Sequence, residues 1–84
     1  MYQKPVYTQH ALDRMTKRQL KSAWVELVIT APDVVEGDKF DPELEHRFGS
    51  VPELANRVLR VIVTKSGPIR VVTMHLDGKM KHKL

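Results

Sequence analysis

Two aliphatic segments in the C-terminal half of the chain constrain its fold more than any other feature. Residues 57–64 and 69–76 are rich in valine and isoleucine, and the residues between them include Gly67 and Pro68. This pattern predicts a β-hairpin. Side chains alternate between the two faces of a strand, so one face of this hairpin is almost wholly apolar. Other parts of the chain must cover that face.

Alternation divides the hairpin side chains into two sets. The apolar face carries Leu59, Val61, Val63, Val72, Met74 and Leu76. The other face carries Arg60, Thr64, Thr73 and His75 among Val58, Ile62, Ile69 and Val71. Exposed sheet faces usually hold fewer branched aliphatic side chains, so we expect the C-terminal tail, a partner or a ligand to cover part of this second face.

The N-terminal part has the periodicity of helices. After an extended lead-in at 5–7, Thr8 is suited to cap a helix that runs to about Arg18. Ser22 is expected to cap a second helix over 23–30. Pro32 ends this helix, because the residue before a proline is pushed out of the helical conformation.

Between the helices and the hairpin, residues 34–36 and 45–48 are short candidate strands, and 49–56 is predicted as a loop or a single helical turn. The chain is therefore expected to form one α+β domain over residues 1–84. In this domain two N-terminal helices pack on one face of a three- to four-stranded antiparallel sheet.

Composition excludes several classes of function. The 84 residues contain no cysteine, which rules out disulfides, thiolate metal sites and cysteine nucleophiles. We expect no metal site and no cofactor, since the histidines are widely spaced and no phosphate-binding glycine loop is present. No apolar segment is long enough for a signal peptide or a membrane span, so a cytoplasmic protein is expected. The small size is compatible with a homo-oligomer or a bound partner.

The first predicted helix carries His10, Arg14 and Arg18 at four-residue steps, which places them on one helix face. Ala11, Leu12 and Met15 fall on another face and are expected to enter the core. An imidazole titrates near neutral pH, and a guanidinium binds phosphate through two parallel hydrogen bonds. Together with a net charge of +4, these groups point to RNA as a partner.

We assign candidate roles on this basis. His10 is the predicted general acid or base, Arg14 and Arg60 stabilise negative charge, and Thr73 positions the substrate. The predicted RNA-binding residues are Arg18, Lys21, Arg47 and His75. His46 and Arg47 point to opposite faces, so only one of them can join the site. Structural alternatives stay open: His10 can bond the sheet, Arg14 and Arg18 can pair with nearby carboxylates, and Arg60 with Thr73 can form an ordinary cross-strand pair.

The segment His10-Ala11-x-x-Arg14-Met15-x-x-Arg18, with Trp24-Val25, Ala31-Pro32 and the final Val71-Val72-Thr73, resembles a bacterial family of small domains. Sequences of that family open His-Ala-x-x-Arg-Met-x-x-Arg-Gly-Ile, and the family is similar in layout to RelE-type and BrnT-type toxins. It also resembles the wider barnase, EndoU, colicin and RelE group of metal-independent ribonucleases. Gln19 replaces the usual glycine here, so the first helix is expected to run on slightly.

The resemblance implies a RelE-like fold and a toxin that cleaves RNA, either free or on the ribosome, by attack of the 2′-hydroxyl. It also implies a small antitoxin-type protein partner. Two other hypotheses share the fold: a nucleic-acid-binding or protein-interaction module without catalysis, and an accessory domain in which His10 and Arg14 form a buried network.

Overall fold

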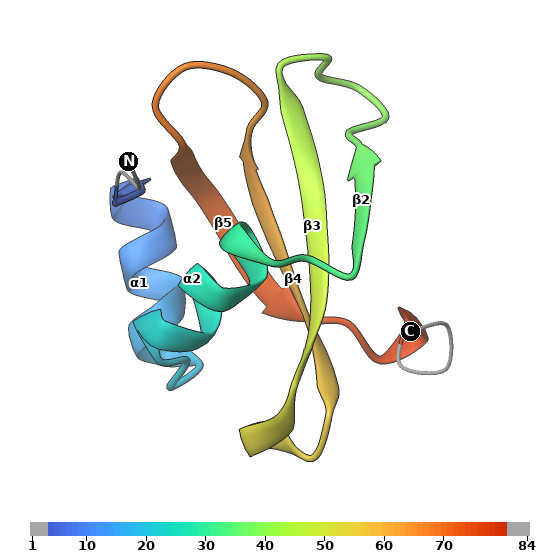
Figure 1. Cartoon of the computed structure of the whole chain (residues 1–84). Coiled ribbons are helices and arrows are strands. Elements are labelled where there is room, and N and C mark those ends of the chain that lie inside the picture. Colours follow the sequence, from blue (N-terminus) through green and yellow to red (C-terminus); the bar gives the residue numbers. More distant parts are fainter. Residues whose placement is uncertain (1–3, 81–84) are drawn as a thin grey trace.

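The computed structural model describes residues 4–80 of the chain (Figure 1). The elements, in chain order, are β1 (Val6–Tyr7), α1 (Gln9–Lys17), α2 (Ser22–Thr30), β2 (Val34–Gly37), β3 (Leu44–Val51), the 3-10 turn η1 (Pro52–Leu54), β4 (Arg57–Thr64), β5 (Arg70–Leu76) and the 3-10 turn η2 (Gly78–Met80). The basic segment 81–84, which we expected to help cover the second sheet face, lies outside the described residues.

The strands form one five-stranded mixed sheet in the order β1-β5-β4-β3-β2. The α+β class is confirmed, but the expectation of three or four antiparallel strands is wrong. The fifth strand is β1, which pairs in parallel with β5 through Val6 with Arg70 and Tyr7 with Val71. The predicted lead-in therefore extends the sheet, because the N–H of Val6 donates to the Ile69 carbonyl at 2.9 Å.

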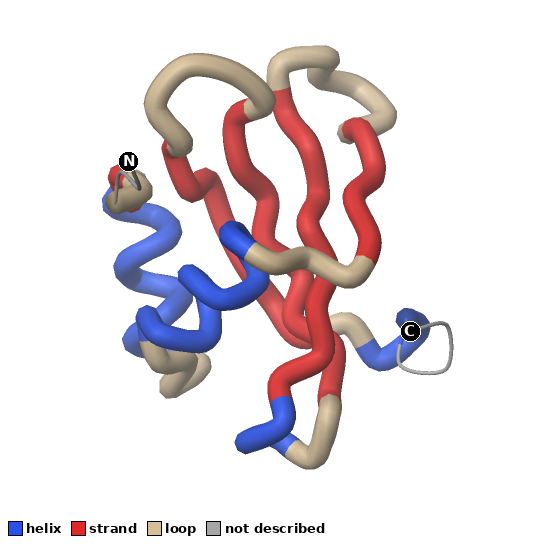
Figure 2. The backbone as a smooth tube through the Cα atoms, viewed as in Figure 1, coloured by secondary structure: helices blue, strands red, loops and turns tan. Residues whose placement is uncertain are grey.

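The two helices lie on different parts of this sheet. Figure 2 shows α2 crossing in front of the central strands while α1 runs beside β5. Thr8 caps α1 as predicted, since its hydroxyl accepts from the Ala11 N–H at 3.1 Å. Ser22 does not cap α2, because the N-cap position belongs to Lys21 and no side chain bonds there. No helix within residues 4–80 is both long and apolar enough to cross a membrane.

The first helix ends earlier than expected, since the absence of glycine at position 19 predicted a helix that runs slightly beyond Arg18. Gln19 adopts the left-handed conformation with φ of 53°, so α1 stops at Lys17 despite the side chain at this position. The Leu20 N–H then donates to the Met15 carbonyl at 2.9 Å, and Leu20 is buried. Burial of Leu20 offsets the cost of the left-handed turn, which is small for a residue without β-branching.

The core lies between the sheet and the helices. Its buried members are Ala11, Leu20, Trp24, Val25, Val28, Ile29, Val51, Leu59, Val61, Val63, Val71 and Met74, and Met15 packs against them. Leu12, which we expected in the core, is exposed. Strand β3 continues to Val51 through the predicted loop at 49–51, because these residues pair with β4. Gly49 also lets α2 approach closely, since a Cβ at this position would lie 3.1 Å from Val28 Cγ2.

A β-bulge in β5 changes the predicted facial sets. Ile62 pairs with Thr73, but Val63 pairs with Val71, which leaves Val72 as the extra residue. Val71 is therefore in the core with Val63, and Val72 is only partly buried. The expectation of Val72 in the core and Val71 outside it is wrong, because a bulge breaks the alternation of side chains along the strand. The predicted pairing of Arg60 with Thr73 is also wrong, since Arg60 pairs with His75.

Candidate functional site

The sheet face turned away from α2, called the open face below, collects most of the polar side chains of the central strands. The register places one alternating set of positions there: Leu44, His46, Phe48 and Ser50 of β3, Val58, Arg60, Ile62 and Thr64 of β4, and Thr73 and His75 of β5. The prediction that His46 and Arg47 point to opposite faces is confirmed, and His46 is the one on the open face.

Helix α1 brings its imidazole to the rim of the open face. His10 is exposed, and its Nε2 lies 3.2 Å from Thr73 Oγ1, within hydrogen-bonding distance. The structural alternative in which His10 bonds the sheet is therefore observed, whereas the alternative with His10 in a buried network does not hold. The hydroxyl of Thr8, which caps α1, donates to the Val72 carbonyl at the bulge at 3.1 Å. The start of α1 is thus fastened to β5 at two adjacent residues, and this fixes the position of His10 beside Thr73.

His75 lies two residues beyond Thr73 on the same face, opposite Arg60 in the register. Burial lowers the pKa of His75 below its ordinary value, and the positive charges of Arg60 and Arg18 lower it further. Asp77 acts in the opposite direction with a smaller effect. The contribution of Arg18 places the C-terminal end of the α1 row (His10, Arg14 and Arg18) within electrostatic reach of His75.

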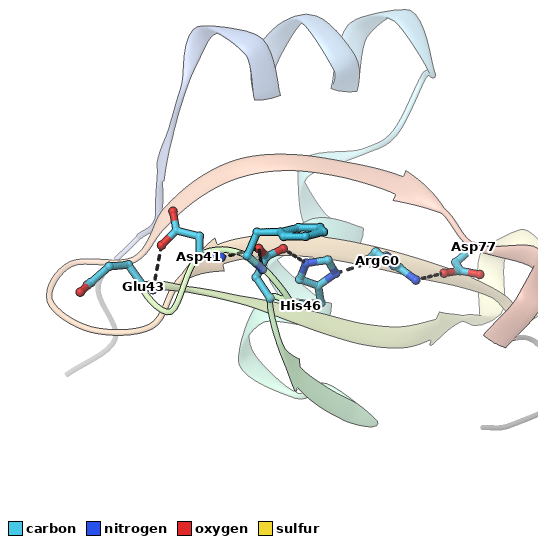
Figure 3. Close-up of polar contacts among 7 residues, drawn as sticks. Asp41, Glu43, His46, Arg60 and Asp77 are labelled. Atoms are coloured by element: carbon cyan, nitrogen blue, oxygen red, sulfur yellow. Dashed lines mark hydrogen bonds and ion pairs between the residues drawn. The ribbon is translucent and has the colours of Figure 1, made fainter.

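A chain of polar contacts crosses the open face from the β2–β3 turn to the end of β5 (Figure 3). His46 Nε2 lies 2.7 Å from Asp38 Oδ1, and Arg60 Nη1 donates to His46 Nδ1 at 3.3 Å. Since a guanidinium can only donate, Nδ1 accepts and Nε2 carries the proton that His46 donates to Asp38. The other end of Arg60 pairs with the buried carboxylate of Asp77. The pKa of Asp38 lies below its usual value because its carboxylate accepts hydrogen bonds from His46 and from the backbone N–H groups of Asp41 and Phe40.

Arg60 also covers a small second core on the open face. Its guanidinium lies 4.7 Å from the centre of the Phe48 ring, and Phe48 is only 1% exposed. Neighbouring Val58 is equally buried, and its carbonyl accepts from the Asp77 N–H at 2.8 Å. Among the described residues, Arg60 Nε is buried without a hydrogen-bond partner. Arg60 is therefore held in place by a ring beneath it and by polar groups at both ends.

Three predicted site residues lie apart from this group or have no specific contact with it. Arg47 is on the helix-covered face, where Nη1 donates to the Ile29 carbonyl at 2.7 Å and Nε to Glu45 at 2.8 Å. Lys21 lies 3.7 Å from Glu53 and 5.4 Å from the centre of the Trp24 ring. Arg14 is half-buried in the α1 row. The predicted residues gathered at the open face are His10, Thr73, His75 and Arg60, with Arg18 nearby.

Sequence reasoning missed Asp38, His46 and Asp77 as parts of the site. Asp38 and Asp77 follow the ends of strands, where an isolated carboxylate has no periodic signal. For His46, the alternation with Arg47 was the available signal, since it requires one of the two to join the open face. Within residues 4–80 no group of three or more histidine, aspartate or glutamate side chains is arranged to hold a metal ion.

A cleft of about 440 Å³ opens beside the polar chain. It is lined by Glu36, Gly37, Asp38, Lys39, Phe40, His46 and Arg60. Because Arg60 both lines this cleft and lies opposite His75, the cleft and the His10–Thr73 rim are neighbouring parts of one surface.

Comparison with known proteins identifies the family. No curated protein and no solved structure shows significant similarity to the chain. A family model described as "Domain of unknown function (DUF4258)" matches residues 7–74. The match runs from the end of β1 through most of β5 and includes His10, Arg60 and Thr73. The chain therefore belongs to the DUF4258 family.

Proposed function

We propose that this protein is a metal-independent endoribonuclease of the RelE-like kind, and that its active site is the part of the open face between α1 and β4. The observation that carries the proposal is the contact of His10 with Thr73 at 3.2 Å. This contact puts an exposed imidazole next to Thr73, which lies two residues from His75 on the same face, and Arg60 lies opposite His75. RNA cleavage without a metal needs two groups that exchange protons near neutral pH and a cation for the phosphate.

The proposed reaction is an internal transfer. A base removes the proton of the 2′-hydroxyl, whose oxygen attacks the adjacent phosphorus, and the 5′-oxygen leaves with a proton from an acid. The products carry a 2′,3′-cyclic phosphate and a 5′-hydroxyl. The lowered pKa of His75 favours its neutral form, which suits it to accept the proton, and exposed His10 is the proton donor. Thr73 orients His10 through their hydrogen bond.

The arginines stabilise charge. Arg60 is fixed by Asp77, His46 and the Phe48 ring, so a transition-state phosphate meets a cation that does not need to reorganise. Arg14 follows His10 by one helical turn and is the second candidate for this role, while Arg18 contacts the RNA backbone. An antitoxin-type protein would inhibit the enzyme by covering the same face.

The test is cleavage of single-stranded and ribosome-bound RNA by purified protein in the presence of EDTA. His10→Ala and Arg14→Ala are each expected to lower the rate roughly 100- to 10,000-fold. Lys21→Ala is the matched control, because it removes a cation that lies beside Glu53, apart from the open face. Circular dichroism and thermal unfolding verify that each variant is folded. If both folded variants cut as fast as the parent, the proposed mechanism is wrong.

A second candidate is an RNA-binding module without catalysis. It is favoured by Arg60, whose two terminal nitrogens each already bind a group within the protein, His46 and Asp77. For this function, RNA would bind with a steep salt dependence and remain intact. Arg18→Ala would weaken binding to all sequences alike, and Lys21→Ala is its charge-matched comparison, since Lys21 lies beside Glu53.

A further inference from the structure

The cleft beside His46 contains one feature that neither the fold nor the proposed reaction uses. Phe40 lines the cleft and is 93% exposed. Its backbone is nevertheless held, because the N–H of Phe40 donates to Asp38 Oδ2 at 3.0 Å and the N–H of Asp41 donates to the same oxygen at 2.9 Å. A second turn follows, in which the N–H of Glu43 donates to Asp41 Oδ1 at 2.9 Å. The bare ring therefore stands on an ordered turn.

The turn is tied to the proposed phosphate site. The second oxygen of Asp38 accepts from His46, and His46 accepts from Arg60. Phe40 and Arg60 are thus connected through one carboxylate and one imidazole, which fixes where the turn lies relative to the guanidinium. Strand β4 separates β3 from β5, and His46 is level with Ile62 whereas His75 is level with Arg60, so two strand spacings and two residues along the strand, roughly 12 Å in all, separate His46 from His75. One nucleotide, from phosphate to base, can bridge such a span.

We propose that this cleft binds a nucleobase of the RNA strand whose phosphate lies at His75 and Arg60, and that the base stacks on Phe40. This inference rests on the proposed function and adds to it a subsite beside the scissile phosphate. A nucleobase has a flat π-face and a polar edge. The cleft offers the matching groups: one aromatic ring, surrounded by the charged or polar side chains of Glu36, Lys39 and His46.

A docked protein fits this surface less well than a base does. The other large hydrophobic side chains exposed among residues 4–79 are Val6, Leu12, Leu27 and Val35. Val6 is on β1, and Leu12 and Leu27 are on the helices. Val35 is on the helix-covered face of β2, since it pairs with Arg47. Phe40 is therefore an isolated ring among charged groups, whereas protein interfaces bury contiguous apolar patches.

The experiment measures binding of short 2′-O-methyl oligoribonucleotides, which lack the attacking hydroxyl, by fluorescence anisotropy at low salt. A series in which one base at a time is removed locates the stacking position. Phe40→Ala is expected to weaken binding of the intact strand roughly 5- to 150-fold. For the strand that lacks the stacked base, the parent and the variant are expected to bind equally. Phe40→Tyr keeps the affinity, and Leu27→Ala is the control for loss of an exposed apolar side chain.

The inference is overturned if Phe40→Ala binds the intact strand like the parent, or if it loses the same factor on every member of the series. An effect of Phe40→Ala on a protein partner but not on RNA also overturns it. If the parent binds RNA and Arg18→Ala weakens that binding while Phe40→Ala does not, the cleft proposal fails and the proposed function stands. If the parent binds no RNA at low salt, both fail.

Discussion

The helix-covered face and the open face of the sheet are built from the same three central strands, but they are covered in different ways. On the helix-covered face, α1 and α2 bury an aliphatic set around Leu59, Val61 and Val63. On the open face, the buried side chains Phe48 and Val58 lie under the polar groups of the sheet itself, most directly Arg60. Separate elements cover the first face, while the candidate site residues cover the second.

This difference has a consequence for how mutations act. Changes on the helix-covered face alter packing and leave the polar groups of the open face in place. On the open face, Arg60 shields a ring, pairs with Asp77 and faces the proposed phosphate, so one substitution affects both stability and binding. Stability and activity therefore have to be measured together there.

The largest expected effect tests whether the open face has a core of its own. Phe48→Ala removes a ring that is 1% exposed, and it is expected to lower the free energy of unfolding by about 3–5 kcal/mol. Urea denaturation measures this, with the exposed ring of Phe40→Ala as the control. A loss below about 1 kcal/mol, the size typical of a surface change, would mean that only the helix-covered face stabilises the fold.

A smaller effect is expected where α2 meets the sheet. Gly49→Ala places a Cβ 3.1 Å from Val28 Cγ2, and it is expected to cost about 1–3 kcal/mol through overpacking. Val28→Ala alone leaves a cavity, and in the double variant with Gly49→Ala the added methyl fills part of it. The loss of stability in the double variant should therefore be smaller than the sum of the two single losses. If the two single losses of stability, measured by thermal unfolding, add up in the double variant, α2 can shift freely on the sheet. The helix-covered face would then be less tightly packed than the contact between Gly49 and Val28 indicates.

The smallest effect concerns the pKa of His75, which links the α1 row to the open face. NMR titration of its imidazole is expected to give a midpoint below 6.5, and Arg18→Gln is expected to raise that midpoint. As pH falls below 6.5 the unfolded chain binds this proton before the folded chain does. The free energy of unfolding therefore falls as pH drops from 6.5 to the folded pKa of His75, and this loss persists below that pKa. Above 6.5 His75 has no such effect.

The matched variant is Lys21→Gln, because Lys21 lies beside Glu53 and apart from the open face, and it should leave the midpoint of His75 unchanged. A midpoint at or above 6.5 in the parent would contradict the burial of His75, and an unchanged midpoint in Arg18→Gln would contradict the electrostatic contact between Arg18 and the open face.

Much of the fold follows from the sequence because it depends on local patterns. The 57–64 and 69–76 hairpin and the Thr8 cap need only neighbouring residues to be recognised, and both are observed, with β5 beginning at Arg70. The parallel strand β1, the bulge at Val72 and the left-handed Gln19 depend on contacts between distant segments. Two residues of β1 carry no periodicity of their own, so only their pairing with β5 defines them as a strand.

The candidate site residues also fall into two groups: those that a local sequence pattern predicts and those that only contacts between distant segments bring together. The spacing of His10, Arg14 and Arg18 is a helical pattern, and alternation predicted Arg60, Thr73 and His75 on one face, which the register bears out. Alternation failed at Val71 and Val72 because the bulge at Val72 lies between Val71 and Thr73. The contacts of Arg60 with Asp77 and of His46 with Asp38 join residues 17 and 8 positions apart, at strand ends where no repeating pattern exists.

The bulge at Val72 also sets how the length of β5 can vary among related chains. Upstream of it, Val71 is held in the core by β1 and Val63; downstream, Met74 and Leu76 face the core while Thr73 and His75 face outward. Loss of Val72 would restore regular pairing and keep Val71 and Met74 inward and Thr73 and His75 outward, because Val63 would still face Val71 and Ile62 would still face Thr73. A one-residue deletion elsewhere in β5 would instead turn the side chains beyond it to the opposite face. Natural length variation in this family should therefore accumulate in turns such as 65–68 and, within β5, be confined to the bulge.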